Sequence, residues 1–305
     1  MAAAAGAKPA TEAAVTSPTV VSYTDLVDFC KTYTIDASCL QDCFNAYEIA
    51  EQDWGRKHKL DEFSQHTFKA KHVEAFAAHG KALNEALRIA LPDLSVTHEV
   101  SDKMVRWSVN SGTEHLEAVE SIGTGTDGYV YVTKKHAIKT PILHSAMDEI
   151  DLSEQDDVRR WQYGIASFHN LREAIKLYIA HKRDPGLFVE LVAFGKTMRE
   201  GVAFVCQVQR RAAYCVNAQV HRRRPKCAAI ANKAVLDAMD RSASLGVIHN
   251  DAKRANVAIE VPFPEGRLPR VQLIDLGNSC VTLTSDAGRT LILTLNASDV
   301  DDVKM

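Results

Sequence analysis

The amino-acid sequence predicts an α+β fold: helices first, then a small sheet-bearing part with one helix, then a mostly helical part. Three observations predict this order. Apolar residues recur at helical spacing from residue 22 to about residue 95. Strand-like alternation dominates from about residue 96 to residue 210, interrupted by one helical stretch at 168–181. Helical spacing returns over 226–245, and this separation of sheet and helices along the chain is typical of the α+β class.

The composition indicates a globular protein, because 46% of the 305 residues are hydrophobic and 25% are charged. A formal net charge of -3 gives no general attraction to nucleic acid or to an anionic membrane, and no apolar run is long enough to span a bilayer. We therefore expect neither a membrane nor a nucleic acid as a partner. Seven cysteines, an odd number, are typical of a reducing compartment, so we expect an intracellular protein, cytoplasmic or nuclear.

The N-terminal part divides into a tail and a helical segment. Residues 1–20 are rich in Ala, Thr and Pro and lack the features of a secretory signal, which predicts a disordered tail. Residues 21–95 include YTDLVDFCKTY and KHVEAFAAHGKALNEALRIAL, read as three or four helices that end near LPDLS. No catalytic pattern occurs among them, so we expect an accessory helical segment.

Two pairs of predicted strands frame the one helix of the sheet-bearing part. GYVYVTKKHAIKT alternates on either side of a Lys-Lys-His turn, and it follows the strand-like stretches VTHEVSDKMVRWSVN and EHLEAVESIG. FHNLREAIKLYIAH has helical spacing and runs into the turn at Pro185 and Gly186. LFVELVAFGK and GVAFVCQVQ then predict a further strand pair.

Three glycines, Gly123, Gly125 and Gly128, form the pattern G-x-G-x-x-G in SIGTGTDGYVYV. A dinucleotide site would need a helix after this pattern, whereas a strand follows here. Two interpretations remain: a hairpin that covers the phosphates of a nucleotide, or a flexible hairpin tip. Lys139, in the strand HAIKT, either faces solvent or lies beneath this hairpin. In the second case Glu173, in the helix NLREAIKLY, is the acid that could hold it.

The stretch GVIHNDAKRANVAI places four polar residue types between apolar flanks. On its own it is as well explained by a turn, because Asn and Asp hydrogen-bond their own backbone. It also matches the pattern H-x-D-x-K-x-x-N through Asp251, Lys253 and Asn256. Nineteen residues after Asn256, Asp275 ends the apolar strand of VQLIDLGNS.

Taken together over about residues 115–280, the glycine hairpin, the strand lysine, the helix glutamate and these two loops resemble the protein-kinase-like fold. The resemblance implies a bilobal fold, with an N-lobe over 96–210 that holds a small sheet and one helix. A mostly helical and shortened C-lobe would follow over 211–305, because 28 residues come after Gly277 and no Ala-Pro-Glu motif occurs.

The same resemblance implies that ATP and Mg²⁺ are the cofactors. The nucleotide would be contacted by residues of the first strands, namely Gly123, Gly125, Gly128, Val130, Ala137 and Lys139. Lys139 would hold the α- and β-phosphates and pair with Glu173.

The resemblance also assigns the catalytic and metal-binding roles. Asp251 would accept the proton of the substrate hydroxyl, and Lys253 would neutralise charge on the γ-phosphate. Asn256 and Asp275 would bind the metal, since Mg²⁺ prefers hard oxygen ligands.

Several features depart from the family pattern. Asn250 replaces the arginine that clamps a phosphorylated activation loop, so we do not expect activation by phosphorylation of that loop. Leu276 stands where Phe is commoner. The acidic segment MDEIDLSEQDDVRR is either a solvated loop or a docking or gating loop, and the basic cluster VHRRRPK is either a solvated loop or an import signal or dock.

These observations predict an ATP- and Mg²⁺-dependent phosphotransferase that acts on Ser or Thr hydroxyls of a protein substrate, as Lys253 favours. A small-molecule kinase similar to aminoglycoside or choline phosphotransferases is an alternative that Asn250 favours. A pseudokinase that binds nucleotide or acts as a scaffold is another alternative, which the short C-lobe favours. The N-terminal helices are a candidate docking site for a regulatory partner.

Overall fold

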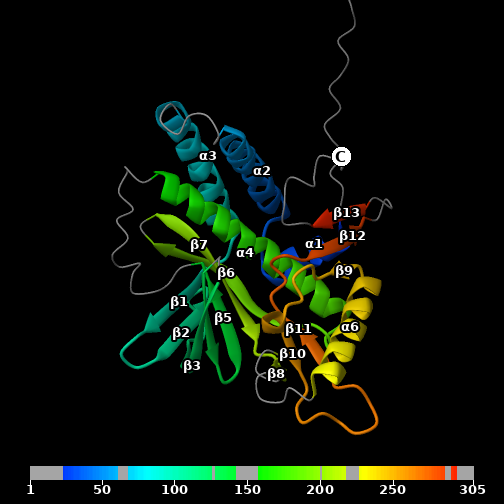
Figure 1. Ribbon diagram of the computed structural model, residues 1–305. Coiled ribbons are helices and arrows are strands. Elements are labelled where there is room, and N and C mark those ends of the chain that lie inside the picture. The colour runs from blue at the N-terminus through cyan, green and yellow to red at the C-terminus, as the bar shows by residue number, and fades with distance from the viewer. Residues whose placement is uncertain are drawn as a thin grey trace, which may run out of the picture.

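Figure 1 shows the computed structural model, which describes residues 23–60, 68–125, 128–141, 157–199, 201–217, 227–285 and 290–293. The predicted tail over 1–20 and the basic cluster at 220–226 lie outside these ranges, as does the acidic segment up to residue 156. Within them, helices and antiparallel sheets combine in a mixed α and β fold, as the sequence predicts. None of the helices in these ranges is long and apolar enough to cross a membrane.

The described part of the N-terminal segment consists mainly of three helices. Its helices are α1 (Thr24–Thr32), α2 (Ala37–Leu60) and α3 (Phe68–Ala90). The last of these ends two residues before Pro92, which has no N–H to donate and disfavours helical backbone in the residue before it. Tyr47 of α2 stacks on Phe168 of the later helix α4 (Asp157–Arg183), with ring centroids 4.1 Å apart. The N-terminal helices therefore share one hydrophobic core with α4.

The central sheet is antiparallel and has the strand order β1-β2-β3-β4-β5-β7-β6. Its first strands are β1 (Leu94–Glu99), β2 (Met104–Val109), β3 (His115–Gly125), β4 (Gly128–Thr133) and β5 (His136–Thr140). The predicted second pair forms β6 (Leu191–Arg199) and β7 (Val202–Arg210). The predicted strand alternation and the Lys-Lys-His hairpin are confirmed, and the first strand begins two residues before the expected boundary at residue 96.

The sheet curls until its first strand lies beside its last. The backbone N–H of Lys196 on β6 donates to the carbonyl of Pro92 at 2.8 Å, and a parallel bridge joins Lys196 to Asp93. Gly195 permits this approach, because a Cβ there would lie 2.5 Å from the Pro92 oxygen. A separate apolar cluster fills the interior, and it contains Leu94, Val96, Val105, Trp107, Tyr131, Ile138, Ala193, Cys206 and Val208.

The outer face of the sheet supports α4 (Asp157–Arg183), which the N-terminal helices cover on its other side (Figure 1). Because side chains alternate along a strand, Ile138 and Val208 face the interior while Lys139 and Gln207 face α4. The helix predicted at 168–181 is confirmed but begins eleven residues earlier, at Asp157. Neighbouring elements cover this helix on several sides, so its apolar residues do not form a single stripe. The apolar period therefore did not reveal its first turns.

The described residues after residue 211 are less helical than predicted. Two of their elements are the α-helix α6 (Ala228–Ser244) and a short 3-10 turn, η4 (Arg254–Asn256). Six short strands form two three-stranded sheets: β8 (Cys215–Val216), β9 (Val247–Ile248), β10 (Val257–Ile259), β11 (Val271–Leu273), β12 (Cys280–Thr284) and β13 (Thr290–Leu293). Short apolar runs such as VAI and VQL thus pair with one another as strands, which corrects the mostly helical prediction.

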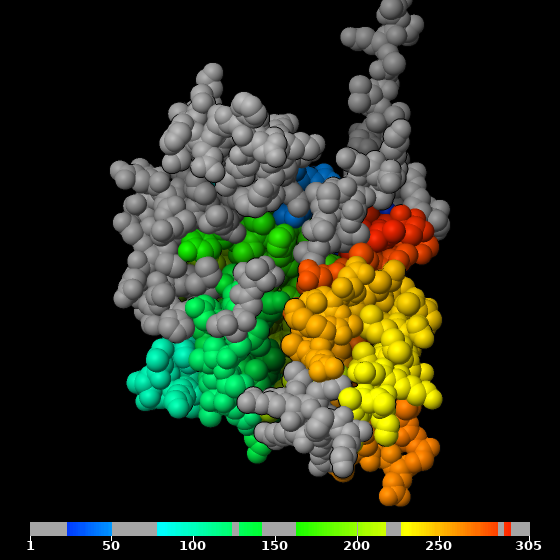
Figure 2. Space-filling view, in the orientation of Figure 1, coloured from blue at the N-terminus to red at the C-terminus, as the bar shows by residue number. Residues whose placement is uncertain are grey.

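These later elements lie beside the central sheet. Figure 2 shows the sheet and α4, in cyan to green, next to the residues from α6 onward, in yellow, orange and red. A backbone bond from Leu273 N–H to the Leu187 carbonyl, 2.8 Å long, joins β11 to the segment between α4 and β6. The candidate site residues come from both sides of this junction.

Candidate functional site

A row of paired residues crosses the central sheet. Gly123 of β3 pairs with Val130 of β4, which in turn pairs with Lys139 of β5. Lys139 also pairs with Gln207 of β7. Ala137, two residues before Lys139, points to the same face of the sheet. The register thus places Val130 and Lys139 beside the glycine strand, and Ala137 lies on the same face as Lys139.

The glycine hairpin closes at Gly125 and Gly128, which pair with each other, and its two tip residues lie outside the described ranges. Gly128 has φ 139°, and a Cβ there would lie 1.9 Å from the carbonyl oxygen of Thr140. Gly123 has ordinary space, since the nearest atom to its added Cβ is 3.9 Å away. The close approach of Gly128 to the end of β5 therefore requires glycine.

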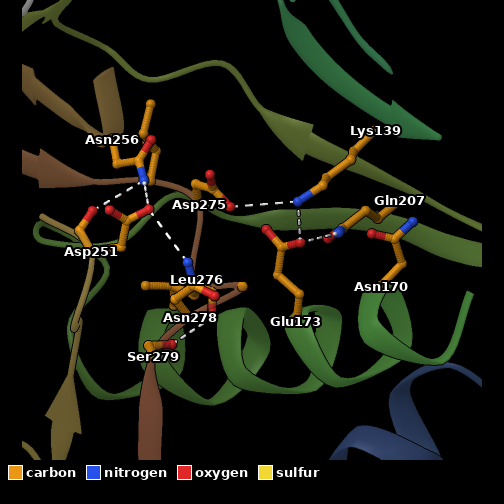
Figure 3. A network of polar contacts seen from close by, with 12 residues as sticks. Lys139, Asn170, Glu173, Gln207, Asp251, Asn256, Asp275, Leu276, Asn278 and Ser279 are labelled. Carbon is orange, nitrogen blue, oxygen red and sulfur yellow. Dashed lines mark hydrogen bonds and ion pairs between the residues drawn. The ribbon is translucent and has the colours of Figure 1, made fainter. Parts of the chain in front are cut away.

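Lys139 joins the sheet to α4 and to the turn after β11. Its ammonium donates to Glu173 Oε2 at 2.5 Å and lies 3.4 Å from Asp275 Oδ1 (Figure 3). Glu173 is 2% exposed, and burial raises the pKa of its carboxyl while the Lys139 ammonium offsets part of that rise. The sequence-predicted pair is thus in contact, and a second carboxylate stands beside it.

The loop after β9 gathers donors on one carboxylate oxygen. Asp251 Oδ2 accepts hydrogen bonds from Lys253 Nζ at 2.8 Å and from Asn256 Nδ2 at 3.0 Å. Asn278, from the turn after β11, approaches the same oxygen at 3.5 Å (Figure 3). The bond from Lys253 is the main reason why the pKa of Asp251 lies below its usual value. Asp251 is therefore held as a carboxylate.

His249 fixes this loop against the strand that leads to Asp275. It is fully buried, and its Nε2 donates to the Ile274 carbonyl at 3.0 Å. Burial lowers the pKa of the imidazole, so the ring stays neutral and holds this bond at neutral pH. The backbone N–H of Ile274 also donates to the Asn256 carbonyl at 3.0 Å. Two bonds therefore hold the Asp251 loop and the Asp275 turn together.

The side-chain oxygens of Asn256 and Asp275 are suitable ligands for a magnesium ion. The amide nitrogen of Asn256 is directed to Asp251, both to its carbonyl and to its carboxylate, which leaves the amide oxygen for another partner. The Asp275 side chain is 45% exposed and accepts the distant contact from Lys139. Carboxylate and amide oxygens are the ligand types that Mg²⁺ takes, together with water and phosphate oxygens.

Two buried residues of this network were not predicted. Gln207 donates from Nε2 to Glu173 Oε2 at 3.1 Å (Figure 3), and Lys176 donates from Nζ to the Gly277 carbonyl at 2.9 Å. The only sequence signal for Gln207 is a polar residue inside the apolar strand VAFVCQV. Lys176 gives no such signal, because lysine is common on exposed helix faces.

Comparison with known proteins finds solved structures of low sequence identity and low structural similarity. No family model matches the sequence, and no curated protein matches it. Among solved structures, the bifunctional kinase-methyltransferase WbdD is 12% identical with a TM-score of 0.37, over 57% of this chain and 36% of that chain. Monomeric WbdD is 12% identical with a TM-score of 0.38, over 70% of this chain and 57% of that chain.

The Rio2 kinase from Chaetomium thermophilum, solved as an ADP/Mg²⁺-phosphoaspartate complex, is 18% identical. Its TM-score is 0.35, over 52% of this chain and 47% of that chain. This chain thus spans about a third to a half of the length of these first two structures. The described residues bring together the row of Val130 and Lys139, the contact of Lys139 with Glu173 and the Asp251 loop, which is the arrangement that the resemblance to the protein-kinase-like fold implies.

Proposed function

We propose that this chain is an ATP- and Mg²⁺-dependent phosphotransferase that phosphorylates Ser or Thr hydroxyls of proteins. The observation that supports it most is the position of Lys139, which donates to buried Glu173 and lies 3.4 Å from Asp275 Oδ1. A cation fixed by a buried carboxylate, beneath a glycine hairpin, is well placed for the α- and β-phosphates of ATP. The neighbouring Asp275 then suits the metal that accompanies those phosphates.

The chemistry assigned to the loop is a proton transfer with charge compensation. Asp251 accepts the proton of the attacking hydroxyl as the new oxygen–phosphorus bond forms and the bond from the γ-phosphorus to the β-phosphate oxygen breaks. Its lowered pKa keeps it ionised and suits late proton transfer in a loose transition state. Lys253, which is 60% exposed beside it, supplies positive charge toward the γ-phosphate. Asn256 and Asp275 would hold Mg²⁺, which would supply positive charge to the phosphate oxygens.

The conformation of Asn250 supports activity that does not depend on a phosphorylated loop. Asn250 has φ 54°, a left-handed conformation that Asn tolerates, and its Nδ2 donates to Cys280 Sγ at 3.2 Å. This side chain is bound to the β12 strand and offers no guanidinium to a phosphate group. We therefore propose that the loop is held by contacts within the chain.

The test is phosphoryl transfer from labelled ATP with Mg²⁺ to generic protein substrates. Lys139→Met and Asp251→Asn should each lower transfer by at least about a hundredfold. The first removes the cation that positions the phosphates, and the second removes the base that accepts the proton. Lys135→Met is the matched control, since Lys135 is exposed in the turn before the strand of Lys139, and it should transfer at the wild-type rate.

Other outcomes would favour the alternatives. Transfer that survives Asp251→Asn would show that the base assignment is wrong. Stabilisation by Mg-ATP without transfer to any acceptor would favour a nucleotide-binding pseudokinase. Transfer to aminoglycoside or choline hydroxyls, with none to protein, would favour a small-molecule kinase.

A further inference from the structure

Lys176 is a second buried lysine of the site. It lies on α4 three residues after Glu173, on a neighbouring part of the same helix face, and its side chain is fully buried. Its Nζ donates to the carbonyl oxygen of Gly277 at 2.9 Å. The helix that supplies the Glu173 carboxylate therefore also reaches the turn that carries Asp275.

Packing alone does not explain why a lysine, rather than an apolar residue, is buried at position 176. The charged or ionisable groups that face it come from its own helix (Arg172 and Glu173), from β5 (Lys139) and from β12 (Cys280). Burial lowers the pKa of Lys176 to about 7, the Arg172 charge adds to that effect, and Glu173 opposes it. An apolar side chain could fill this volume without the desolvation of an amine, so the hydrogen bond to Gly277 is the feature that the amine adds.

The turn that receives this bond is restrained at several carbonyls. Within residues 274–277, three carbonyl oxygens accept hydrogen bonds, and their donors are His249, Ser279 and Lys176. Asp275 has φ 61°, a left-handed conformation that a non-glycine residue keeps only when its surroundings impose it. Of the three donors, Lys176 is the one on α4. It links the turn directly to the helix of Glu173.

We propose that Lys176 is a positioning residue, which holds the Asp275 turn in its left-handed conformation and so sets the Mg²⁺ affinity of the nucleotide site. This inference rests on the proposed function. Residues that orient a metal ligand through a hydrogen bond typically change metal affinity by about 10- to 100-fold when they are removed. Lys176 would act through the Gly277 carbonyl and would touch neither the nucleotide nor the metal.

The experiment measures ATP affinity of the full chain by calorimetry, with Mg²⁺ and with Mg²⁺ chelated, for the wild type, Lys176→Met and Lys196→Met. Lys196 is the matched control, because its amine also lies in a largely buried position and donates to a backbone carbonyl, that of Leu91, at the seam between β1 and β6. In Lys176→Met, the factor by which Mg²⁺ strengthens ATP binding should be at least about tenfold smaller than in the wild type. The affinity for ATP without Mg²⁺ should stay within about twofold of the wild-type value. Lys196→Met should keep the gain.

Each other outcome has a definite meaning. If Lys176→Met keeps the full gain from Mg²⁺, or weakens ATP equally with and without Mg²⁺, the positioning role is overturned and the proposed function stands. If the wild type binds no ATP in either condition, the proposed function fails and this inference fails with it. If Lys176→Met does not fold, Lys176→Gln takes its place with the same expectation. The glutamine side chain is shorter than that of lysine, so its amide does not reach the Gly277 carbonyl in the way the lysine amine does.

Discussion

Glu173 Oε2 accepts a hydrogen bond from Gln207 Nε2 at 3.1 Å, and the same oxygen accepts the Lys139 ammonium. The amide of Gln207 is turned this way by Gln209, whose Nε2 donates to Gln207 Oε1 at 3.1 Å. Both glutamines are buried on the face of β7 that meets α4. The carboxylate that pairs with Lys139 is therefore held from two strands, β5 and β7.

Replacing Gln207 by Met should disturb the Lys139 pair with little change in volume. The buried Glu173 carboxylate would lose one donor, which should lower the free energy of unfolding by about 1–3 kcal/mol and phosphoryl transfer by several-fold. Urea unfolding and steady-state kinetics measure the two effects. Gln209→Met is the control, because it keeps the donor to Glu173 and should reduce transfer less. Equal effects of the two variants would contradict this role of Gln207.

Gly128→Ala should destabilise the protein strongly, whereas Gly123→Ala should not. At Gly128 the backbone has φ 139° and an added Cβ would overlap the Thr140 carbonyl oxygen at 1.9 Å, while at Gly123 the nearest atom is 3.9 Å away. We expect a loss of about 2 kcal/mol or more for Gly128→Ala and about 0.5 kcal/mol or less for Gly123→Ala. Denaturant unfolding compares them. Similar stabilities for both variants would show that the hairpin end adjusts freely.

Arg183→Met should destabilise the protein, because it removes the contacts that join the end of α4 to the elements around it. The guanidinium donates to the carbonyls of Leu245 at 3.0 Å and Thr282 at 2.9 Å, and it pairs with Asp25 of α1 at 2.8 Å. Removing it leaves two backbone carbonyls without this donor, which should lower the free energy of unfolding by about 2 kcal/mol.

The neighbouring lysine provides the control for this variant. Lys182 is 45% exposed and pairs with Asp28 at the surface, where ion pairs contribute little. Lys182→Met should therefore leave the thermal midpoint nearly unchanged while Arg183→Met lowers it clearly. A large shift for Lys182→Met, or none for Arg183→Met, would contradict the importance of these carbonyl contacts.

The stability of the protein should rise with pH in the alkaline range because of Lys176. Its pKa in the folded chain is about 7, below the ordinary value of 10.5, so between these pH values the unfolded chain binds more protons. The free energy of unfolding therefore increases as pH rises across this window, with an upper limit of about 1.4 kcal/mol per pH unit. Below pH 7 both states are protonated and this contribution is flat.

Lys176→Met removes the titrating group and should remove this slope. Urea midpoints of the wild type and the variant, measured at several pH values from 7 to 10, give the difference directly, and titrations shared by both proteins cancel in it. Parallel curves would mean that the Lys176 amine is not perturbed in the folded state.

Residues close together in the sequence were predictable as a group. Asp251, Lys253 and Asn256 lie within six positions, so their closeness follows from the local chain. Strand alternation likewise places Lys139 and Ala137 on the same face of the sheet. The contact of Lys139 with Glu173, 34 residues away, was one of two interpretations of this lysine, and the resemblance to kinases favoured it.

The helical N-terminal segment was also predictable, from apolar spacing alone, but its place was not. Nothing in YTDLVDFCKTY shows that Phe29 packs in one core with α4, or that Asp25 meets Arg183. The mostly helical prediction after residue 211 went wrong for a related reason. Strands of two to five residues are too short to show a period, and their pairing partners lie elsewhere in the chain.

The sequence by itself determined the local motifs: the glycine hairpin, the strand that carries Lys139, the helix that carries Glu173 and the spacing of the Asp251 loop. Only the tertiary structure decided that Gln207 and Lys176 are buried members of the same network. A glutamine on a strand or a lysine on a helix is ordinarily solvated. Its burial depends on all the elements that cover that face, and here these come from distant parts of the chain, which no local pattern records.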